Sequence, residues 1–237
     1  MANKSTSIPK PVNEPILTYL PGSTEKTSLK AKLHELKSQQ IEVPLIIGGE
    51  EIKTGHMGEM RLPHDHQHLL GRYHKAGKKE IKMAIEAAMD AWQSWSKMPW
   101  EDRFSIFKKM ASILQRHDDQ TINASTMLGQ SKNAFQAEVD ASCEMIDFLN
   151  FNCWYAQEIY AQQPMYSPDE TDNKTEHRPL EGFVFAVTPF NFTSIAANLP
   201  SAPALMGNTA IWKPASSTVY PAYFLMKLFK DAGLPDG

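Results

Sequence analysis

The sequence predicts an α/β fold whose last part, residues 182–237, is a βαβα unit. Three observations favour this fold class. Phe183–Val187 is apolar at every position, as expected for a parallel strand that is buried on both faces. Gly207 follows an apolar stretch at a position typical of the residue just past a helix end. Thr209–Trp212 is then a second apolar run, and Lys213 stands at its end.

The unit is expected to close with one more helix. Its first turn can be capped by Ser216, Ser217 or Thr218, because hydroxyl oxygens accept hydrogen bonds from free backbone N–H groups. Gly233 is expected to end this helix. Asn191 lies in the turn between the first strand and the helix that follows it, so Asn191 and Lys213 belong to the carboxyl ends of consecutive strands. Open α/β sheets bind ligands at that edge.

Residues 1–40 are expected to form an arm and a helix. Residues 1–25 are rich in Pro, Ser, Thr and Asn, which favours an extended arm. Leu29, Leu33 and Leu36 then recur at the spacing of one helix face, which predicts a helix over Thr27–Gln39.

Residues 41–163 are expected to form a hairpin followed by helices. Val43–Ile52 reads as two short strands around a Gly-Gly turn. Amphipathic spacing predicts a helix over residues 78–96 and another over Glu101–Arg116. The positions expected to face inward are Ile81, Ile85, Ala88, Trp92 and Trp95 in the first helix, and Phe104, Phe107, Met110, Ala111 and Leu114 in the second.

A third, long helix is expected to start after Ser131, as its cap, and to run towards Tyr160. Residues 164–181 then form a connector. Its polar composition and its three prolines between residues 164 and 179 predict a loop or an excursion of an edge strand.

The composition is that of an ordinary soluble protein, with 42% hydrophobic and 22% charged residues among 237. The net charge of −3 gives no reason to expect nucleic acid or an anionic membrane as a partner. No apolar run reaches the roughly 20 residues of a membrane span. The length is sufficient for a sizeable core in one or two domains.

Several segments, in order along the chain, resemble the NAD(P)-dependent aldehyde dehydrogenases. The strongest are Pro189–Thr193 (PFNFT), Ala202–Asn208 (APALMGN) and Trp212–Pro214 (WKP). Others lie upstream: Asn13–Pro15, Ala84–Ala88, Met127–Gln130, Gln136–Asp140, Ile146–Phe148 and Gln162–Pro164. Within that family the chain resembles the Δ1-pyrroline-5-carboxylate (L-glutamate γ-semialdehyde) dehydrogenase branch.

This resemblance implies the N-terminal part of the aldehyde dehydrogenase fold: a helical preface and the first βαβα of a Rossmann-like cofactor domain. It implies NAD as cofactor, with NADP not excluded, an aldehyde substrate oxidised to L-glutamate in proline degradation, and a homo-oligomer built partly through residues 160–181. A cytoplasmic location is expected, or the mitochondrial matrix in a eukaryote. Family members are much longer, and their nucleophilic cysteine, base glutamate and Gly-rich pyrophosphate turn come later than anything in this sequence. The 237 residues alone are therefore expected to be inactive.

Asn191 is the candidate catalytic residue. A side-chain amide N–H can stabilise the oxyanion that forms when a thiolate adds to an aldehyde. The other reading of the turn is an asparagine that satisfies its own backbone. The resemblance implies that Lys213 binds the adenosine ribose, that Thr188, Pro189 and Phe190 line the cofactor groove, and that Glu144 and Phe192 lie near the aldehyde. Without it, Lys213 is a solvated charge, Glu144 an exposed helix carboxylate and Phe192 a core residue.

Three further observations limit these expectations, and one rival interpretation stands beside them. Ser216 stands where many relatives carry Glu or Asp, which leaves the choice between NAD and NADP open. Cys143 and Cys153 fall inside an apolar helix and are not expected to be nucleophiles. His64, His66 and His68 alternate in a polar connector, and surface histidines are favoured there over a metal site. A rival interpretation is a complete, non-catalytic protein that binds nucleotide or full-length subunits.

Overall fold

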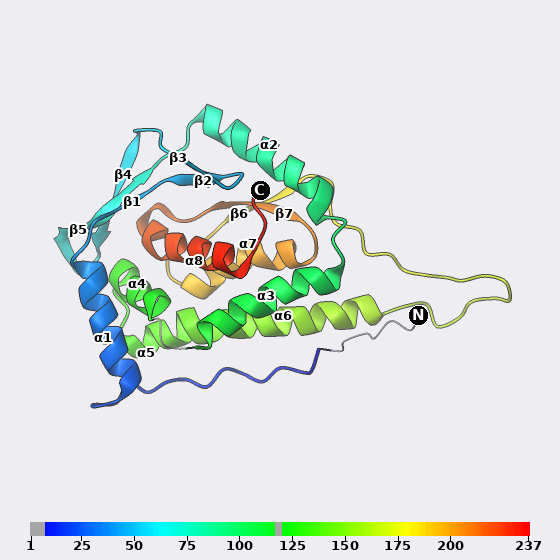
Figure 1. Ribbon diagram of the computed structural model, residues 1–237, viewed down its shortest axis with the longest axis horizontal. Coiled ribbons are helices and arrows are strands. Elements are labelled where there is room, and N and C mark those ends of the chain that lie inside the picture. The colour runs from blue at the N-terminus through cyan, green and yellow to red at the C-terminus, as the bar shows by residue number, and fades with distance from the viewer. Residues whose placement is uncertain (1–7, 117–119) are drawn as a thin grey trace.

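The computed structural model describes residues 8–116 and 120–237, which form an α/β structure (Figure 1). The helices are α1 (Thr24–Lys37), α2 (Lys78–Trp95), α3 (Trp100–Leu114), α4 (Thr121–Gln130), α5 (Ala134–Ala137), the π-helix η1 (Glu138–Cys143), α6 (Glu144–Ala161), α7 (Thr193–Leu205), the 3₁₀ turn η2 (Ser216–Thr218) and α8 (Val219–Ala232). The strands are β1 (Ile41–Val43), β2 (Leu45–Ile47), β3 (Glu50–Ile52), β4 (Met57–Leu62), β5 (Asp65–His74), β6 (Phe183–Val187) and β7 (Thr209–Lys213).

The predicted βαβα unit is present as β6, α7, β7 and α8. Strands β6 and β7 are parallel and in register, from Phe183 opposite Thr209 to Val187 opposite Lys213. Helix α7 contacts both strands, and α2 also contacts both, so helices from distant parts of the sequence flank this pair. Gly207 follows the end of α7 with φ 91°, a left-handed conformation that glycine adopts without strain. Gly233, with φ 94°, ends α8 in the same way.

Most of the apolar core lies where α3, α6, α7 and α8 meet (Figure 1). The predicted inward face of α3 is confirmed, because Phe104, Phe107, Met110 and Ala111 are buried. Arg103 is buried beside them. Its guanidinium donates hydrogen bonds to the carbonyls of Leu205 and Met98 and to the Tyr160 hydroxyl, which ties α3 to the end of α7.

A second core joins α1 and α4 to a three-stranded sheet of order β1-β5-β4, in which β1 is parallel and β4 antiparallel to β5. Strands β2 and β3 form the predicted hairpin. The segment with the three alternating histidines was predicted to be a polar connector, and this prediction is wrong. The segment forms the turn and the first half of the β4–β5 hairpin, with His64 in the turn and His66 and His68 on β5. Charged and polar residues on an exposed strand end had hidden the period-2 pattern.

The predicted long third helix is also corrected. Residues 121–130, for which no element was predicted, form α4, and Ser131 ends that helix in a left-handed conformation (φ 56°). Asn133 caps the next segment instead, because its side chain accepts a hydrogen bond from the Gln136 N–H. The path towards Tyr160 then passes through α5, the π-helix and α6. Thr218 occupies the cap position of α8, but its side chain makes no capping hydrogen bond.

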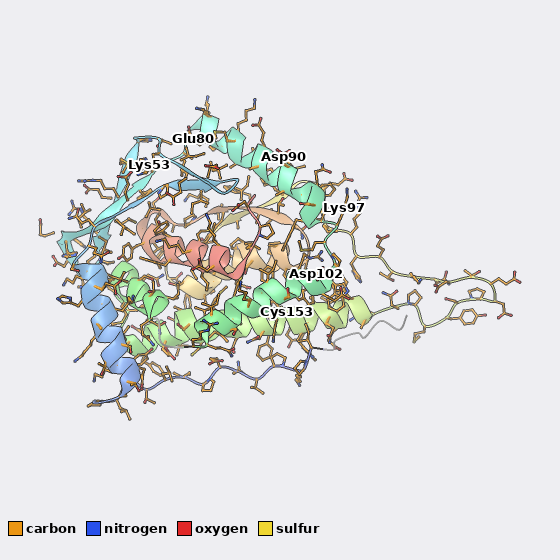
Figure 2. The ribbon with its side chains drawn as sticks, viewed as in Figure 1. Lys53, Glu80, Asp90, Lys97, Asp102 and Cys153 are labelled. Atoms are coloured by element: carbon orange, nitrogen blue, oxygen red, sulfur yellow. The ribbon has the colours of Figure 1, made fainter. Side chains whose placement is uncertain are left out.

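Three burial expectations are wrong. Strand β6 is not buried on both faces, since Phe185 is 60% and Val187 is 56% exposed. Ile81 and Ile85, expected to face inward on α2, are also exposed, whereas Ala88 and Trp95 are buried. Figure 2 labels two acidic residues of α2, Glu80 and Asp90, of which Asp90 is exposed.

Two non-regular segments frame the core. From Ile8 to Ser23 the arm runs past α6, where the Glu14 N–H and the Asn13 amide bind the carboxylate of Asp147. Residues 162–182 form an extended loop that projects from the body (Figure 1). Residues 164–181 had been predicted to form either a loop or an excursion of an edge strand. The structure has no strand among these residues, so the loop is the alternative that it shows.

Candidate functional site

The carboxyl ends of β6 and β7 lie side by side and hold the candidate cofactor residues. Thr188 directly follows β6, and its N–H donates to the carbonyl of Lys213 at 3.2 Å. The Trp212 indole N–H donates to the Thr188 hydroxyl oxygen at 2.9 Å. Thr188 is buried, whereas the side chain of Lys213 is exposed. A buried hydroxyl and an exposed ammonium group therefore stand at one edge of the sheet.

Asn191 lies in the turn between β6 and α7 and is exposed. Among the described residues, none forms a hydrogen bond with its side chain, so the amide is not used to satisfy the backbone of its own turn. Phe190 is 65% exposed and Pro189 is half-buried next to it. The turn thus presents an aromatic face and a free amide to the outside of the sheet edge.

Phe192 ends the turn and is half-buried. The Lys132 ammonium nitrogen lies 4.3 Å from the centre of the Phe192 ring, a cation–π geometry. Lys132 also pairs with Asp140 at 2.5 Å. A hollow of about 300 Å³ adjoins this group, with Lys132, Ser131 and residues of α1 and α4 among its lining. The sequence had not drawn attention to Lys132.

The first turn of α7 is anchored by two buried hydroxyls. Thr193 and Ser194 are 1% and 0% exposed. The Thr193 oxygen lies 2.8 Å from the Thr126 hydroxyl and accepts the Gln130 amide N–H at 2.8 Å. The Ser194 hydroxyl donates to Glu144 Oε2 at 2.6 Å, within the range of a charge-assisted bond. Both anchors were missed from the sequence, where the only signal was two adjacent hydroxyl residues at a helix start.

The structure therefore brings most predicted site residues together. Thr188, Pro189, Phe190, Asn191 and Phe192 share one turn, with Lys213 beside its first residue. Glu144 begins α6 and reaches the same turn through its bond to α7. Its carboxylate is half-buried and accepts from the buried Ser194 hydroxyl, whereas the Asn191 side chain is exposed.

The two cysteines lie elsewhere and are free and buried. Cys153 lies on α6 where that helix passes α3 (Figure 2). Burial raises the pKa of the Cys153 thiol to about 12. Burial, with the nearby Glu138 carboxylate as a second cause, raises the pKa of the Cys143 thiol still further. Both environments oppose the thiolate that a nucleophile needs.

Two of the three alternating histidines bond to protein groups. His64 Nδ1 lies 2.8 Å from the Ser131 hydroxyl, and His68 Nε2 lies 3.0 Å from the Lys37 carbonyl. Within residues 8–116 and 120–237, no group of three or more His, Cys, Asp or Glu side chains is arranged to hold a metal ion. Over the same residues, no helix has both the length and the apolar character needed to cross a bilayer.

The carboxyl edge of parallel strands is where open α/β sheets bind ligands, and this edge carries an exposed amide and a lysine. The chain belongs to the aldehyde dehydrogenase family, whose family model matches residues 53–237. It is 46% identical over 231 residues to the Δ1-pyrroline-5-carboxylate dehydrogenase of Agaricus bisporus, covering 97% of this chain and 42% of that protein. The mitochondrial Δ1-pyrroline-5-carboxylate dehydrogenase of Homo sapiens is 42% identical over 232 residues, covering 98% and 41%.

Solved structures agree in fold. The Δ-pyrroline-5-carboxylate dehydrogenase of Mycobacterium tuberculosis, bound with NAD and cobalamin, matches with a TM-score of 0.96 and 45% identity, over 100% of this chain and 44% of that one. A 1-pyrroline-5-carboxylate dehydrogenase from Thermus with bound NAD matches with a TM-score of 0.87 and 29% identity, over 97% and 44%. The chain thus spans about two fifths of the length of these relatives.

Proposed function

We propose that the chain is the N-terminal part of an NAD-dependent L-glutamate γ-semialdehyde (Δ1-pyrroline-5-carboxylate) dehydrogenase, which oxidises the aldehyde to L-glutamate in proline degradation. The substrate rests on the two named curated relatives, at 46% and 42% identity over nearly the whole chain, and the pathway rests on the family resemblance. The observation on this chain that carries the proposal is the Asn191 amide, which is exposed in the turn after β6 and has no hydrogen-bond partner among the described residues.

The role proposed for Asn191 is to stabilise negative charge. When a thiolate adds to an aldehyde, the carbonyl oxygen becomes an oxyanion, and a fixed N–H donor lowers the energy of that state. The amide of Asn191 donates without losing a proton, so it acts equally over a wide pH range. Phe192 and Glu144 are proposed to lie near the aldehyde chain.

The proposed contacts with a bound dinucleotide come from Lys213, Thr188, Pro189 and Phe190. The exposed Lys213 ammonium offers hydrogen bonds to ribose hydroxyls, and the exposed Phe190 ring with half-buried Pro189 offers an apolar wall at the same edge. The Thr188 hydroxyl oxygen accepts the Trp212 indole N–H, which fixes the position of this side chain at the edge of the sheet. NAD, when bound, supplies the acceptor for the aldehyde hydride.

Two further parts of the proposal concern the whole protein. A homo-oligomer is proposed, with the projecting loop 162–182 as a contact region. A cytoplasmic location is proposed, or the mitochondrial matrix in a eukaryote, as the names of several eukaryotic relatives suggest.

The test starts from the natural reading frame. The protein encoded by that frame, including whatever follows residue 237, is assayed for NADH formation from γ-semialdehyde and NAD. Asn191→Ala and Asn191→Asp are expected to lower kcat by about 10²–10³, because neither side chain can donate an N–H. Normal turnover in both variants would contradict the role of Asn191.

The 237 residues purified alone are expected to produce no NADH. The resemblance implies that the nucleophile, the base and the pyrophosphate turn come later in family members than the part that these residues match. Clear turnover by this chain would refute that expectation. A reading frame that stops after codon 237 and yields a folded product would instead favour the rival, a non-catalytic nucleotide-binding or subunit-interaction protein.

A further inference from the structure

We infer that the buried hydroxyls of Thr193 and Ser194 are positioning residues, which fix the direction of the Asn191 amide by anchoring the start of α7. The inference rests on the proposed role of Asn191 and adds to it the part of the chain that holds the donor in place.

The first step is the contrast in burial across four residues. Phe190 and Asn191 are exposed, whereas Thr193 and Ser194 are almost completely buried. Asn191 lies only two residues before Thr193, the first residue of the helix. Its backbone direction is therefore set by the placement of that first turn.

The second step is that the turn is held at both ends. On the strand side, Thr188 is bonded to the backbone of Lys213 and to the indole of Trp212. On the helix side, Thr193 and Ser194 are bonded through their hydroxyls to residues of α4 and α6. A donor between two fixed ends needs little reorganisation when charge appears, which is the condition for strong electrostatic stabilisation.

The third step concerns what each anchor would leave behind if it were lost. The Gln130 amide nitrogen donates to Thr193, while the buried Gln130 Oε1 has no hydrogen-bond partner among the described residues. Loss of the Thr193 hydroxyl would leave both polar atoms of that amide unpaired, so Gln130 would have to move. Loss of the Ser194 hydroxyl would release the Glu144 carboxylate from the start of α7.

The fourth step assigns directions to the two anchors. Thr126 and Gln130 belong to α4, and Glu144 is the first residue of α6. The start of α7 is thus tied to two separate helices, which fixes its rotation as well as its distance.

The test uses the protein encoded by the natural reading frame, with kcat and KM measured for γ-semialdehyde at saturating NAD. Thr193→Val keeps the shape of the side chain but loses the hydroxyl, and it is expected to lower kcat about 10- to 100-fold while KM changes little, because small misplacements of a catalytic group have costs of that size. Thr193→Ser restores the hydroxyl and is expected to restore kcat.

The matched control is Ser201→Ala. Ser201 is also a buried serine of α7, but its hydroxyl bonds only to the carbonyl of Asn198 in the same helix. Its kcat is expected to remain within about twofold of the parent, as for a change away from the reacting groups. A Thr193→Val variant no slower than Ser201→Ala would overturn the inference.

A double variant separates positioning from general structural damage. If Thr193 acts through Asn191, then adding Thr193→Val to Asn191→Ala lowers kcat no further, because no donor is left to position. Multiplying losses would overturn the inference while leaving the role of Asn191 intact. Unchanged turnover in Asn191→Ala would overturn both. Should Thr193→Val not fold, Ser194→Ala is paired with Asn191→Ala and judged by the same criterion.

Discussion

At the scale of single residues, most polar side chains around the site already form hydrogen bonds or ion pairs inside the protein. The hydroxyls of Thr188, Thr193 and Ser194 are all engaged inside the protein, and the Lys132 ammonium is paired with Asp140. Asn191 is different, because it is a polar side chain in the same turn with no partner among the described residues. A free donor on a fixed turn favours the proposal that Asn191 stabilises an oxyanion over the alternative that it satisfies the backbone of its own turn.

Cys153 gives a prediction for pH dependence. Burial raises the pKa of its thiol to about 12 in the folded chain, whereas an unfolded thiol titrates near about 8.5. Above the unfolded pKa, the unfolded state has lost a proton that the folded state still holds, so stability falls as pH rises. The contribution is complete below about pH 8.5 and is lost as pH approaches 12.

The measurement is urea unfolding, between pH 8 and pH 10.5, of the protein encoded by the natural reading frame. Cys153→Ala is expected to be less stable at pH 8 but to lose stability less steeply with pH, by up to about 1.4 kcal/mol per pH unit. Cys143 and the buried tyrosines titrate equally in both proteins, so they cancel. Identical slopes would show that the Cys153 thiol is not held protonated by folding.

Ser216 gives a prediction for cofactor choice. It is exposed three residues after Lys213, at the edge where the ribose is proposed to lie. In the protein encoded by the natural reading frame, Ser216→Glu is expected to lower kcat/KM for NADP about fivefold relative to NAD, since a surface charge pair is worth about 1 kcal/mol. Ser216→Gln, which has the same size without the charge, is the control. If the ratio of kcat/KM for NADP to kcat/KM for NAD is the same in both variants, the ribose does not lie near residue 216.

At the scale of elements, the π-helix η1 carries a buried carboxylate that fixes the N-terminal arm. Glu138 is fully buried and accepts hydrogen bonds from the Tyr19 hydroxyl at 2.6 Å, the Asn123 amide at 2.7 Å and the Leu17 N–H at 3.1 Å. Burial and the neighbouring Glu138 carboxylate raise the pKa of the Tyr19 hydroxyl well above its usual range. The hydroxyl therefore stays protonated and keeps donating.

Glu138→Ala is expected to release the arm locally. A hydrogen bond to a charged group contributes about 1.5–3 kcal/mol, so the amide of Leu17 is expected to exchange its hydrogen about 10- to 100-fold faster. Hydrogen–deuterium exchange of peptides covering residues 12–20 measures this. Glu158→Ala removes an exposed carboxylate from α6 and should leave the exchange unchanged. Equal exchange in both variants would mean that the arm is held by its other contacts.

The elements that could be predicted are those whose pattern is local. Helix α3 and strand β7 follow from apolar spacing alone, and Gly207 and Gly233 mark helix ends because their positive φ favours glycine. Helix α4 could not be found in this way, since its buried face includes polar residues such as Asn123 and Thr126, which are satisfied by distant partners. The π-helix depends likewise on the arm that packs against it.

The candidate site shows the same division. Asn191 and Lys213 could be singled out from the sequence because they stand at the carboxyl ends of consecutive strands, together with the family resemblance. Ser194 and Thr193 could not be assigned, because their roles depend on α4 and α6, which lie 50 or more residues away in the sequence. The periodicity of the sequence predicts where strands end. It does not predict which distant side chains hold a turn in place, because those contacts form only in the tertiary structure.

At the scale of the whole molecule, the chain exposes an apolar strand. Strand β6 pairs only with β7 among the described strands, and Phe185 and Val187 are more than half exposed. Unpaired strand edges and exposed apolar faces favour association between chains. The purified 237-residue chain is therefore expected to aggregate or to be only partly folded, and a sharp two-state melting transition of a monomer would argue against this.

A charge on the exposed face tests the cause of this association. Phe185→Lys is expected to lower light scattering and to shift elution in size-exclusion chromatography towards the monomer, because a charged side chain on an open strand opposes pairing with another chain. Ile81→Lys is the matched control, since Ile81 is similarly exposed at 53% but belongs to the helix α2 and not to a strand edge. If both variants improve solubility equally, net charge and not the β6 face controls association. If only Phe185→Lys does so, the face of β6 is the surface that this chain leaves uncovered.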